Sequence, residues 1–199
     1  MEKQLIISVG REYGSGGHEI AQKLADHYGL PLYDHNLLDE MAEKKNLSAK
    51  ELSAFDEKQK GLFFNHKVRG MSISPAENVA ELQFKYLKEK AASGESFVIV
   101  GRCADSILRD RKNILNICIY APLEARLQNC VKELGMDEDK ALEQIKTVDE
   151  ARAAYRRKHC PECTSEFDDR HLMIDSSRFG IEKTSEILTD IVKNTVAKD

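Results

Sequence analysis

This sequence of 199 residues contains no long hydrophobic run, and no stretch approaches the ~18 apolar residues that a membrane-spanning helix requires. Residues 1–4 lead directly into the first apolar segment, without the charged and apolar regions of a signal peptide. We therefore expect a cytoplasmic protein with no membrane partner.

The sequence also lacks a net positive charge, since its formal charge at pH 7 is −4. A protein that binds nucleic acid usually presents a basic surface to the phosphate backbone. Hydrophobic residues make up 41% and charged residues 32%, as in an ordinary globular domain. These values favour small-molecule partners over nucleic acid.

The sequence has five cysteines, an odd number, which favours reduced thiols over a disulfide framework. Cys160 and Cys163 form one Cys-x-x-Cys pair, but no second pair exists to complete a zinc site. We predict an ordinary loop here and assign no metal ligands. A zinc site completed by His159 or His171, or a redox pair, are the alternatives.

Glycines are concentrated near the N-terminus, where residues 8–18 read SVGREYGSGGH. An apolar run precedes this segment, and apolar residues at helical spacing follow it. Strand, glycine-rich turn and helix form a phosphate cradle, because glycines let consecutive amides converge on an anion. The helix start contributes further unpaired N–H groups. The alternative is a glycine-rich turn without a ligand.

The loop lacks the lysine of the standard pattern G-x-x-x-x-G-K-[ST]. If Gly16 is the late glycine of that pattern, Gly17 occupies the lysine position and His18 the Ser/Thr position. We expect Arg11 or Arg102 to supply the missing charge. Ser15 is the candidate for the missing hydroxyl.

Apolar runs that alternate with helical patterns predict five strands, near residues 4–10, 30–34, 96–100, 114–120 and 171–175. Strand, helix and strand within about thirty residues indicate a parallel sheet. Ligands of such sheets bind beyond the carboxyl ends of the strands. Asp34 lies at such an end, so it is a ligand-binding candidate, with an N-cap of the next helix as the alternative.

Two further segments carry charged candidates. Arg102 and Asp105 follow the third strand, where an arginine fork can hold a phosphate and a carboxylate can hold a sugar hydroxyl. An Arg102–Asp105 ion pair is the alternative. A charged helix over 139–158 carries Arg152 and Arg156 four residues apart, with Asp149 placed to orient Arg152. A solvated face is the alternative there.

These elements predict one three-layer α/β/α P-loop NTPase domain with a five-stranded parallel sheet. Its core covers 1–34, 94–135 and 168–199, with a helical acceptor-binding insert at about 35–92 and a lid at about 139–167. The blocks at residues 7–21, 32–34 and 98–108 resemble the cytidylate kinase-like family, a divergent relative of bacterial CMP kinase. Residues 149–156 and 172–180 also match, so the resemblance covers nearly the whole chain.

The resemblance implies transfer of a phosphoryl group from ATP, with Mg²⁺, to CMP or dCMP. It implies that the ATP phosphates bind at Arg11, Gly14, Ser15, Gly16, Gly17 and His18. It implies acceptor binding by Asp34 and Arg102, and catalysis by Arg152, Arg156 and Arg102. The family's acidic residue in the segment of Arg102 is Val100 here, and Asp105 is the candidate substitute for acceptor binding. A kinase for another small acceptor and a non-catalytic nucleotide-binding protein remain alternatives.

Overall fold

The computed structural model describes residues 4–34, 37, 75–165 and 167–196. Most of the predicted acceptor-binding insert, at residues 35–36 and 38–74, lies outside the described residues. The described part contains the whole predicted sheet. It also contains the whole predicted lid except residue 166.

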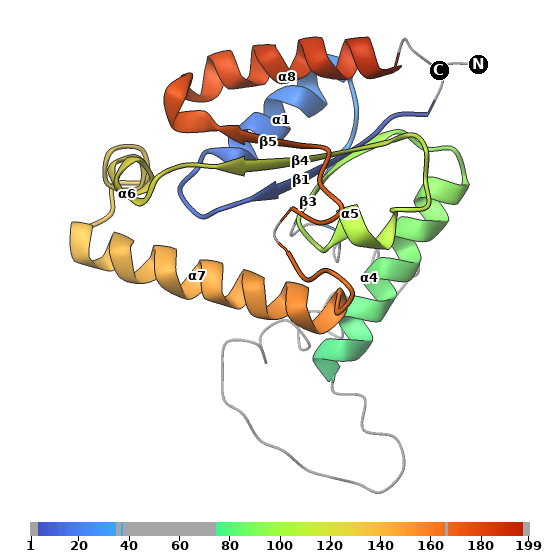
Figure 1. Cartoon of the computed structure of the whole chain (residues 1–199), viewed down its shortest axis with the longest axis horizontal. Helices are drawn as coiled ribbons and strands as arrows, with labels where there is room; N and C mark the ends of the chain where they lie inside the picture. Colours follow the sequence, from blue (N-terminus) through green and yellow to red (C-terminus); the bar gives the residue numbers. More distant parts are fainter. Residues whose placement is uncertain (1–3, 35–36, 38–74, 166, 197–199) are drawn as a thin grey trace, which may run out of the picture.

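Within these residues, five strands form one parallel sheet, as predicted. The strands are β1 (Ile6–Arg11), β2 (Leu32–Tyr33), β3 (Phe97–Val100), β4 (Ile114–Tyr120) and β5 (Leu172–Asp175). Their spatial order is β2-β3-β1-β4-β5, so β1 lies at the centre (Figure 1). β2 is shorter than predicted because only its two residues pair with β3.

Two helices cover one face of the sheet (Figure 1). They are α1 (Gly17–Tyr28) and α8 (Gly180–Val196), and the 3₁₀ turn η2 (Ser176–Arg178) leads from β5 to α8. Leu24 and Leu188 are fully buried between the helices and the apolar side chains of the strands. This layer fixes the start of α1, and with it the glycine-rich loop, against the carboxyl end of β1.

The opposite face is covered by α4 (Pro75–Ala92) and the short helix α5 (Ala104–Ile107). Tyr86 and Leu87 of α4 pack in the same buried cluster as Phe97 and neighbouring strand residues. The sheet thus lies between two helical layers, which confirms the predicted three-layer α/β/α architecture. The last turns of α4, inside the stretch predicted as an insert, belong to this packed layer.

The spacing of Leu82, Tyr86 and Leu87 in the sequence indicates one shared apolar face of α4, but the structure leaves Leu82 36% exposed. The buried described positions of α4 are Val79, Ala80, Gln83, Tyr86, Leu87 and Ala91. Ala80, Leu87 and Ala91 place the centre of this face away from Leu82, which therefore lies at its edge.

A third group of helices lies beyond the carboxyl end of the sheet. Helix α6 (Leu123–Lys132) is followed by the long α7 (Glu138–His159). Cys130 and Ile145 form a small buried cluster between them, against which Tyr13 of the glycine-rich loop packs. In the described part of the chain, none of the helices has the length and hydropathy needed to cross a bilayer.

Candidate active site at the glycine-rich loop

The glycine-rich loop connects β1 to α1 with donors facing outward. Gly14 has φ 77°, and a Cβ there would lie 2.8 Å from the backbone oxygen of Arg126, so no other residue fits. Within the described residues, the amide N–H groups of Gly14, Gly16, Gly17 and His18 donate to no acceptor. Unpaired amides at a glycine-rich turn and a helix start form an anion-binding arrangement.

Ser15 supports this loop from inside. Its side chain is fully buried, and its hydroxyl lies 2.9 Å from the Glu12 backbone oxygen and 3.3 Å from that of Ile119. The Ser15 carbonyl in turn accepts a 2.7 Å hydrogen bond from the Ser176 hydroxyl. The hydroxyl that we expected to face a ligand therefore holds the loop, and the Ser15 amide likewise donates within the loop, to the Glu12 backbone oxygen at 3.5 Å.

Arg11 lies where a side chain at Gly17 would begin. A Cβ added to Gly17 would be 2.5 Å from the Cβ of Arg11, and a Cβ on Gly101 would collide with Nη1 of Arg11. The Arg11 side chain therefore crosses from the loop toward the end of β3, the strand next to β1. This packing explains why the lysine position of the standard loop holds a glycine.

The charge around Arg11 is strongly positive. Burial, followed by repulsion from Arg152 and Arg102, lowers the pKa of Arg11 from 12.5 to about 10, although Asp34 and Asp149 act in the opposite direction. Arginines that converge in a partly buried place are stabilised by an anion. Arg11, Arg102 and Arg152 thus lie near one another at the carboxyl end of the sheet.

Asp34 also lies near Arg11. It is 5% exposed, and its Oδ2 is 3.5 Å from Nδ1 of His18. Its backbone oxygen accepts a 3.4 Å hydrogen bond from the Leu37 amide. His18 and Asp34, which the sequence predicts to be ligand-binding residues, therefore lie next to each other. The N-cap alternative depends on residues 35–36, which lie outside the described residues.

A clamp that the sequence did not reveal holds the loop from the side of α6 and α7. The Tyr13 amide donates to Oδ1 of Asp149 at 2.9 Å, and Arg126 reaches Oδ2 of Asp149 at 2.5 Å. Arg126 also donates to the Tyr13 carbonyl at 3.3 Å, and Asn129 donates to the Gly14 carbonyl at 3.0 Å. These contacts join residues from three separate segments, so no local pattern indicates them.

Arg152 belongs to the same network, with Asp149 oriented toward it as predicted. Its Nη1 lies 3.6 Å from Oδ1 of Asp149 and donates to the Arg11 carbonyl at 3.2 Å. Its guanidinium also lies 5.9 Å from the centre of the Tyr13 ring. Burial lowers the pKa of Arg152, while Asp149 partly restores it. The charged helix α7 therefore turns one arginine inward toward the loop.

Arg156 is held further along α7 by different partners. Nη1 pairs with Oδ2 of Asp105 at 2.7 Å, and Nη2 donates to the Asp168 carbonyl at 2.9 Å. Burial acts to lower the pKa of Arg156, but the charge and hydrogen bond of Asp105 outweigh it and raise the pKa. Asp105 thus forms its ion pair with Arg156, and among the described residues no Arg102–Asp105 ion pair is present.

Arg102 occupies a strained backbone position after β3, with φ 60° in the left-handed region. Such strain in a residue other than glycine is typical of functional sites. Burial raises the pKa of Tyr155 on α7 to about 12, with Arg102 acting in the opposite direction. Arg102 therefore lies between Tyr155 and Arg11, where its side chain extends the positive region toward α7.

The donors present fit the phosphates of a nucleotide, because unpaired amides and arginine forks bind phosphate oxygens. Mg²⁺ in such sites is held largely by the phosphates, with one or two carboxylates. Asp34 is the buried carboxylate beside Arg11 and His18. Among the described residues, no group of three or more His, Cys, Asp or Glu side chains could hold a metal by itself.

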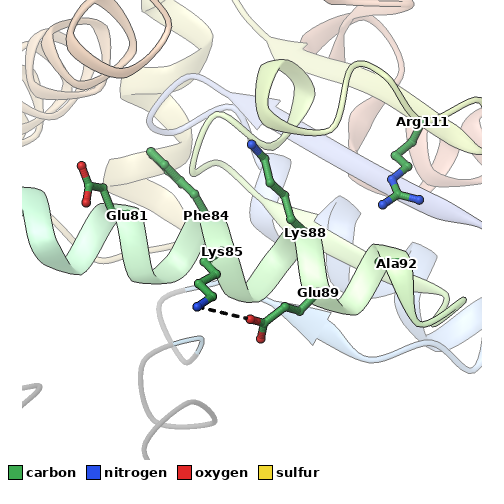
Figure 2. A pocket seen from close by; sticks show the side chains of 7 residues that line it. All are labelled: Glu81, Phe84, Lys85, Lys88, Glu89, Ala92 and Arg111. Carbon is green, nitrogen blue, oxygen red and sulfur yellow. Dashed lines mark ion pairs between the residues drawn. The ribbon is translucent and has the colours of Figure 1, made fainter.

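A groove of about 510 Å³ lies elsewhere, on the outer face of α4 (Figure 2). Its lining includes Phe84, Lys88 and Arg111, together with the pair of Lys85 and Glu89, whose charged atoms are 4.0 Å apart. It shares no residue with the predicted site. We assign the site to the glycine-rich loop because the convergent amides and arginines are there.

Comparison with known proteins bears on this site. The model of the cytidylate kinase-like family matches residues 6–178. A cytidylate kinase from Methanopyrus kandleri is 24% identical over 193 residues, which cover 92% of this chain and 91% of that protein. The structure of an uncharacterized protein from Eubacterium ventriosum has a TM-score of 0.73 at 29% identity, covering 96% of this chain and 99% of that one.

A shikimate kinase from Acinetobacter baumannii, solved in complex with shikimate, has a TM-score of 0.52 at 14% identity and covers 97% of this chain and 96% of that one. At that identity the likeness shows the fold alone, and it confirms the predicted P-loop kinase fold. The family model, in contrast, extends over most of the sequence, including the loop, Arg102 and α7. By this match the chain belongs to the cytidylate kinase-like family.

Proposed function

We propose that this protein transfers a phosphoryl group from ATP, with Mg²⁺, to CMP or dCMP. Membership of the cytidylate kinase-like family and the P-loop kinase fold support a nucleotide kinase. The single observation that carries the proposal is the position of Arg11. Its stem packs against Gly17 and its guanidinium lies beside Gly101, so an arginine brings a cation to the carboxyl end of the sheet, where the loop lacks its lysine.

In this proposal the loop amides of Gly14, Gly16, Gly17 and His18 bind phosphate oxygens of ATP. Arg11 and Arg152 neutralise charge on the group being transferred, as arginines do in other phosphoryl-transfer sites. Bound Mg²⁺ would supply further neutralisation, with Asp34 as the carboxylate available to it.

Acceptor binding in this proposal falls to Arg102 and Asp34, which follow the carboxyl ends of β3 and β2. Asp105 and Arg156 bind each other, so they fix the turn after β3 against α7 and leave direct acceptor contact mainly to Arg102. Positioning of reactants in this way, without a covalent intermediate, is sufficient for phosphoryl transfer.

The test is ADP formation from ATP and Mg²⁺ with a panel of acceptors: CMP, dCMP, UMP, AMP, GMP, cytidine and shikimate. We expect the highest kcat/KM with CMP or dCMP. Preference for a nucleoside or for shikimate would replace the proposed acceptor. Binding of ATP without turnover on any acceptor would identify a non-catalytic nucleotide-binding protein.

A further inference from the structure

Exposed apolar side chains are concentrated on α6, which lies at one edge of the molecule (Figure 1). In the described part of the chain, seven large hydrophobic residues are exposed, and three of them lie in α6 or just after it. Leu123 is 45% exposed, Val131 is 37% exposed and Leu134 is 59% exposed. Apolar residues that gather on one surface, unlike those scattered singly, indicate an interaction site. The proposed phosphoryl transfer uses none of these side chains.

These residues form one stripe along the helix. Leu123, Leu127 and Val131 repeat every four residues, and Leu134 follows about one turn later, so all four lie along one side of α6. Leu127 is partly buried against the small cluster of Cys130 and the residues of α7 that pack on it. The stripe, here called the α6 stripe, therefore continues outward from the packed contact between α6 and α7.

A row of polar residues runs beside the α6 stripe. Glu124, Gln128 and Lys132 also repeat every four residues, and all three are exposed. Among the described residues, neither Glu124 nor Lys132 has an ion-pair partner. The acid lies in the first turn of α6 and the base in its last turn. A second α6 that runs antiparallel to the first would present the same two charges in the opposite order.

We propose that the α6 stripe is the surface on which a second copy of this chain docks, with the two α6 helices antiparallel about a two-fold axis near Gln128. Because Glu124 and Lys132 are equally distant from Gln128, this axis places Glu124 of each copy opposite Lys132 of the other. It also places Leu123 of each copy opposite Leu134 of the other. One self-complementary surface, as a two-fold dimer requires, thus forms an apolar seam flanked by two ion pairs.

The size of this surface sets the strength of the pairing. A stable protein–protein interface buries about 800 Å² of each partner, from roughly 20–30 residues a side. Helix α6 has 10 residues, and part of its surface is already buried within the chain. We therefore expect a weak dimer that forms on concentration and dissociates on dilution.

Pairing at α6 would reach the glycine-rich loop, because the inner side of the same helix holds that loop. Arg126 donates to the Tyr13 carbonyl at 3.3 Å, and Asn129 donates to the Gly14 carbonyl at 3.0 Å. A second copy that restrains α6 therefore restrains these two contacts. This consequence rests on the proposed function, and it predicts that the dimer binds ATP more tightly than the monomer.

The test is sedimentation velocity of the full chain, without nucleotide, over a wide range of protein concentration. We expect the mean mass to rise from that of one chain toward that of two. This readout does not depend on activity, so it separates failure of the pairing from failure of the function proposed above. A chain that stays monomeric at every concentration, or that grows beyond two copies, would overturn the two-fold pairing.

A charge in the apolar seam should prevent the pairing. Val131→Glu should raise the dimer Kd by about tenfold or more, because the new carboxylate would be buried without a partner. Phe167→Glu, at a 65% exposed apolar side chain in the loop after α7, is the matched control and should dimerise as wild type does. Circular dichroism verifies that both variants fold. Equal dimer Kd values for the two variants would show that the α6 stripe is not the interface.

Reversal of the flanking charges tests the register. Lys132→Glu alone should raise the dimer Kd roughly fivefold, since each ion pair of the seam becomes a repulsion between exposed carboxylates. Lys132→Glu combined with Glu124→Lys should restore the wild-type Kd, because opposite charges again face each other. A double variant that does not recover would overturn the antiparallel arrangement. Equal ATP affinity of Val131→Glu and wild type, at concentrations where wild type is dimeric, would refute the coupling to the loop.

Discussion

At the scale of single residues, the main feature is the exchange of lysine for arginine in the phosphate loop. In the standard loop the lysine follows the late glycine, but here that position is Gly17 and Arg11 lies across it. The stem of Arg11 packs against Gly17, and its guanidinium lies beside Gly101, after β3. We propose that this guanidinium supplies the charge that the absent lysine would bring.

Exchange of the two positions tests this relocation. Gly17→Lys alone should lower stability and activity because its Cβ would lie 2.5 Å from the Cβ of Arg11. Arg11→Gly alone should lower kcat/KM by about 10²–10³, the usual cost of losing one charge-stabilising group. The double variant should recover part of both losses, which a double-mutant cycle measures as coupling. Strictly additive losses would show that Arg11 does not occupy the lysine's place.

Arg152 is the residue for which we predict the clearest effect on turnover. It contacts the Arg11 carbonyl and Asp149, next to the glycine-rich loop, and we propose that it acts on the transition state. Arg152→Ala should lower kcat by about 10³ with a smaller change in KM. Arg157→Ala, an exposed position on the same helix, is the control. Equal effects of the two variants in steady-state kinetics would show that Arg152 has no special part in turnover and that the charges of α7 serve only as a solvated surface.

At the scale of elements, α7 is attached to the phosphate loop by one carboxylate. Asp149 accepts a hydrogen bond from the Tyr13 amide and forms ion pairs with Arg126 and Arg152. The Arg126 side chain is only 11% exposed. Removal of a partly buried carboxylate leaves such partners without compensation. The loop, α6 and α7 are thus one connected unit.

We expect Asp149→Ala to destabilise the protein by about 1–3 kcal/mol, a typical cost of leaving charged partners unsatisfied. It should also raise KM for ATP, because the loop loses its attachment at Tyr13. Asp149→Asn retains an acceptor for the Tyr13 amide, so its stability should fall between those of wild type and Asp149→Ala. Glu150→Ala, exposed and adjacent, is the control for thermal unfolding and kinetics. Unchanged stability in Asp149→Ala would show that Asp149 does not hold the loop to α7.

The difference between local sequence patterns and contacts that join distant segments explains what the sequence could predict. The five strands and α1 were predictable because apolar periodicity and glycine-rich turns are local signals, and β4 matches residue for residue. The Arg126–Asp149 and Arg156–Asp105 pairs were not, because each joins segments far apart in the chain. Arg152 and Arg156 could be identified as charged candidates, but only tertiary packing distinguishes the arginine at the loop from the one held by Asp105.

At the scale of the whole molecule, we expect the converging arginines to make the protein more stable with a bound anion than without one. The pKa of Arg11 is lowered to about 10 chiefly by burial, so its charged form is disfavoured in the folded state. Each unit of such a shift corresponds to about 1.4 kcal/mol, which partial exposure of the site reduces. The free energy lost here is recovered when phosphate oxygens approach.

This argument predicts opposite effects of one substitution with and without nucleotide. Arg11→Met keeps the apolar stem over Gly17 but removes the charge, so its unfolding temperature without ligand should equal or exceed that of wild type. ATP at 100 times its Kd should stabilise wild type by about 2.7 kcal/mol, or about 5–10 °C for a chain of this length. The variant should show little of this shift, and adenosine, which has no phosphate, should shift neither protein. Full ATP stabilisation of Arg11→Met in a thermal unfolding assay would mean that the nucleotide phosphates are bound without Arg11. The loop amides would then have to supply the binding alone.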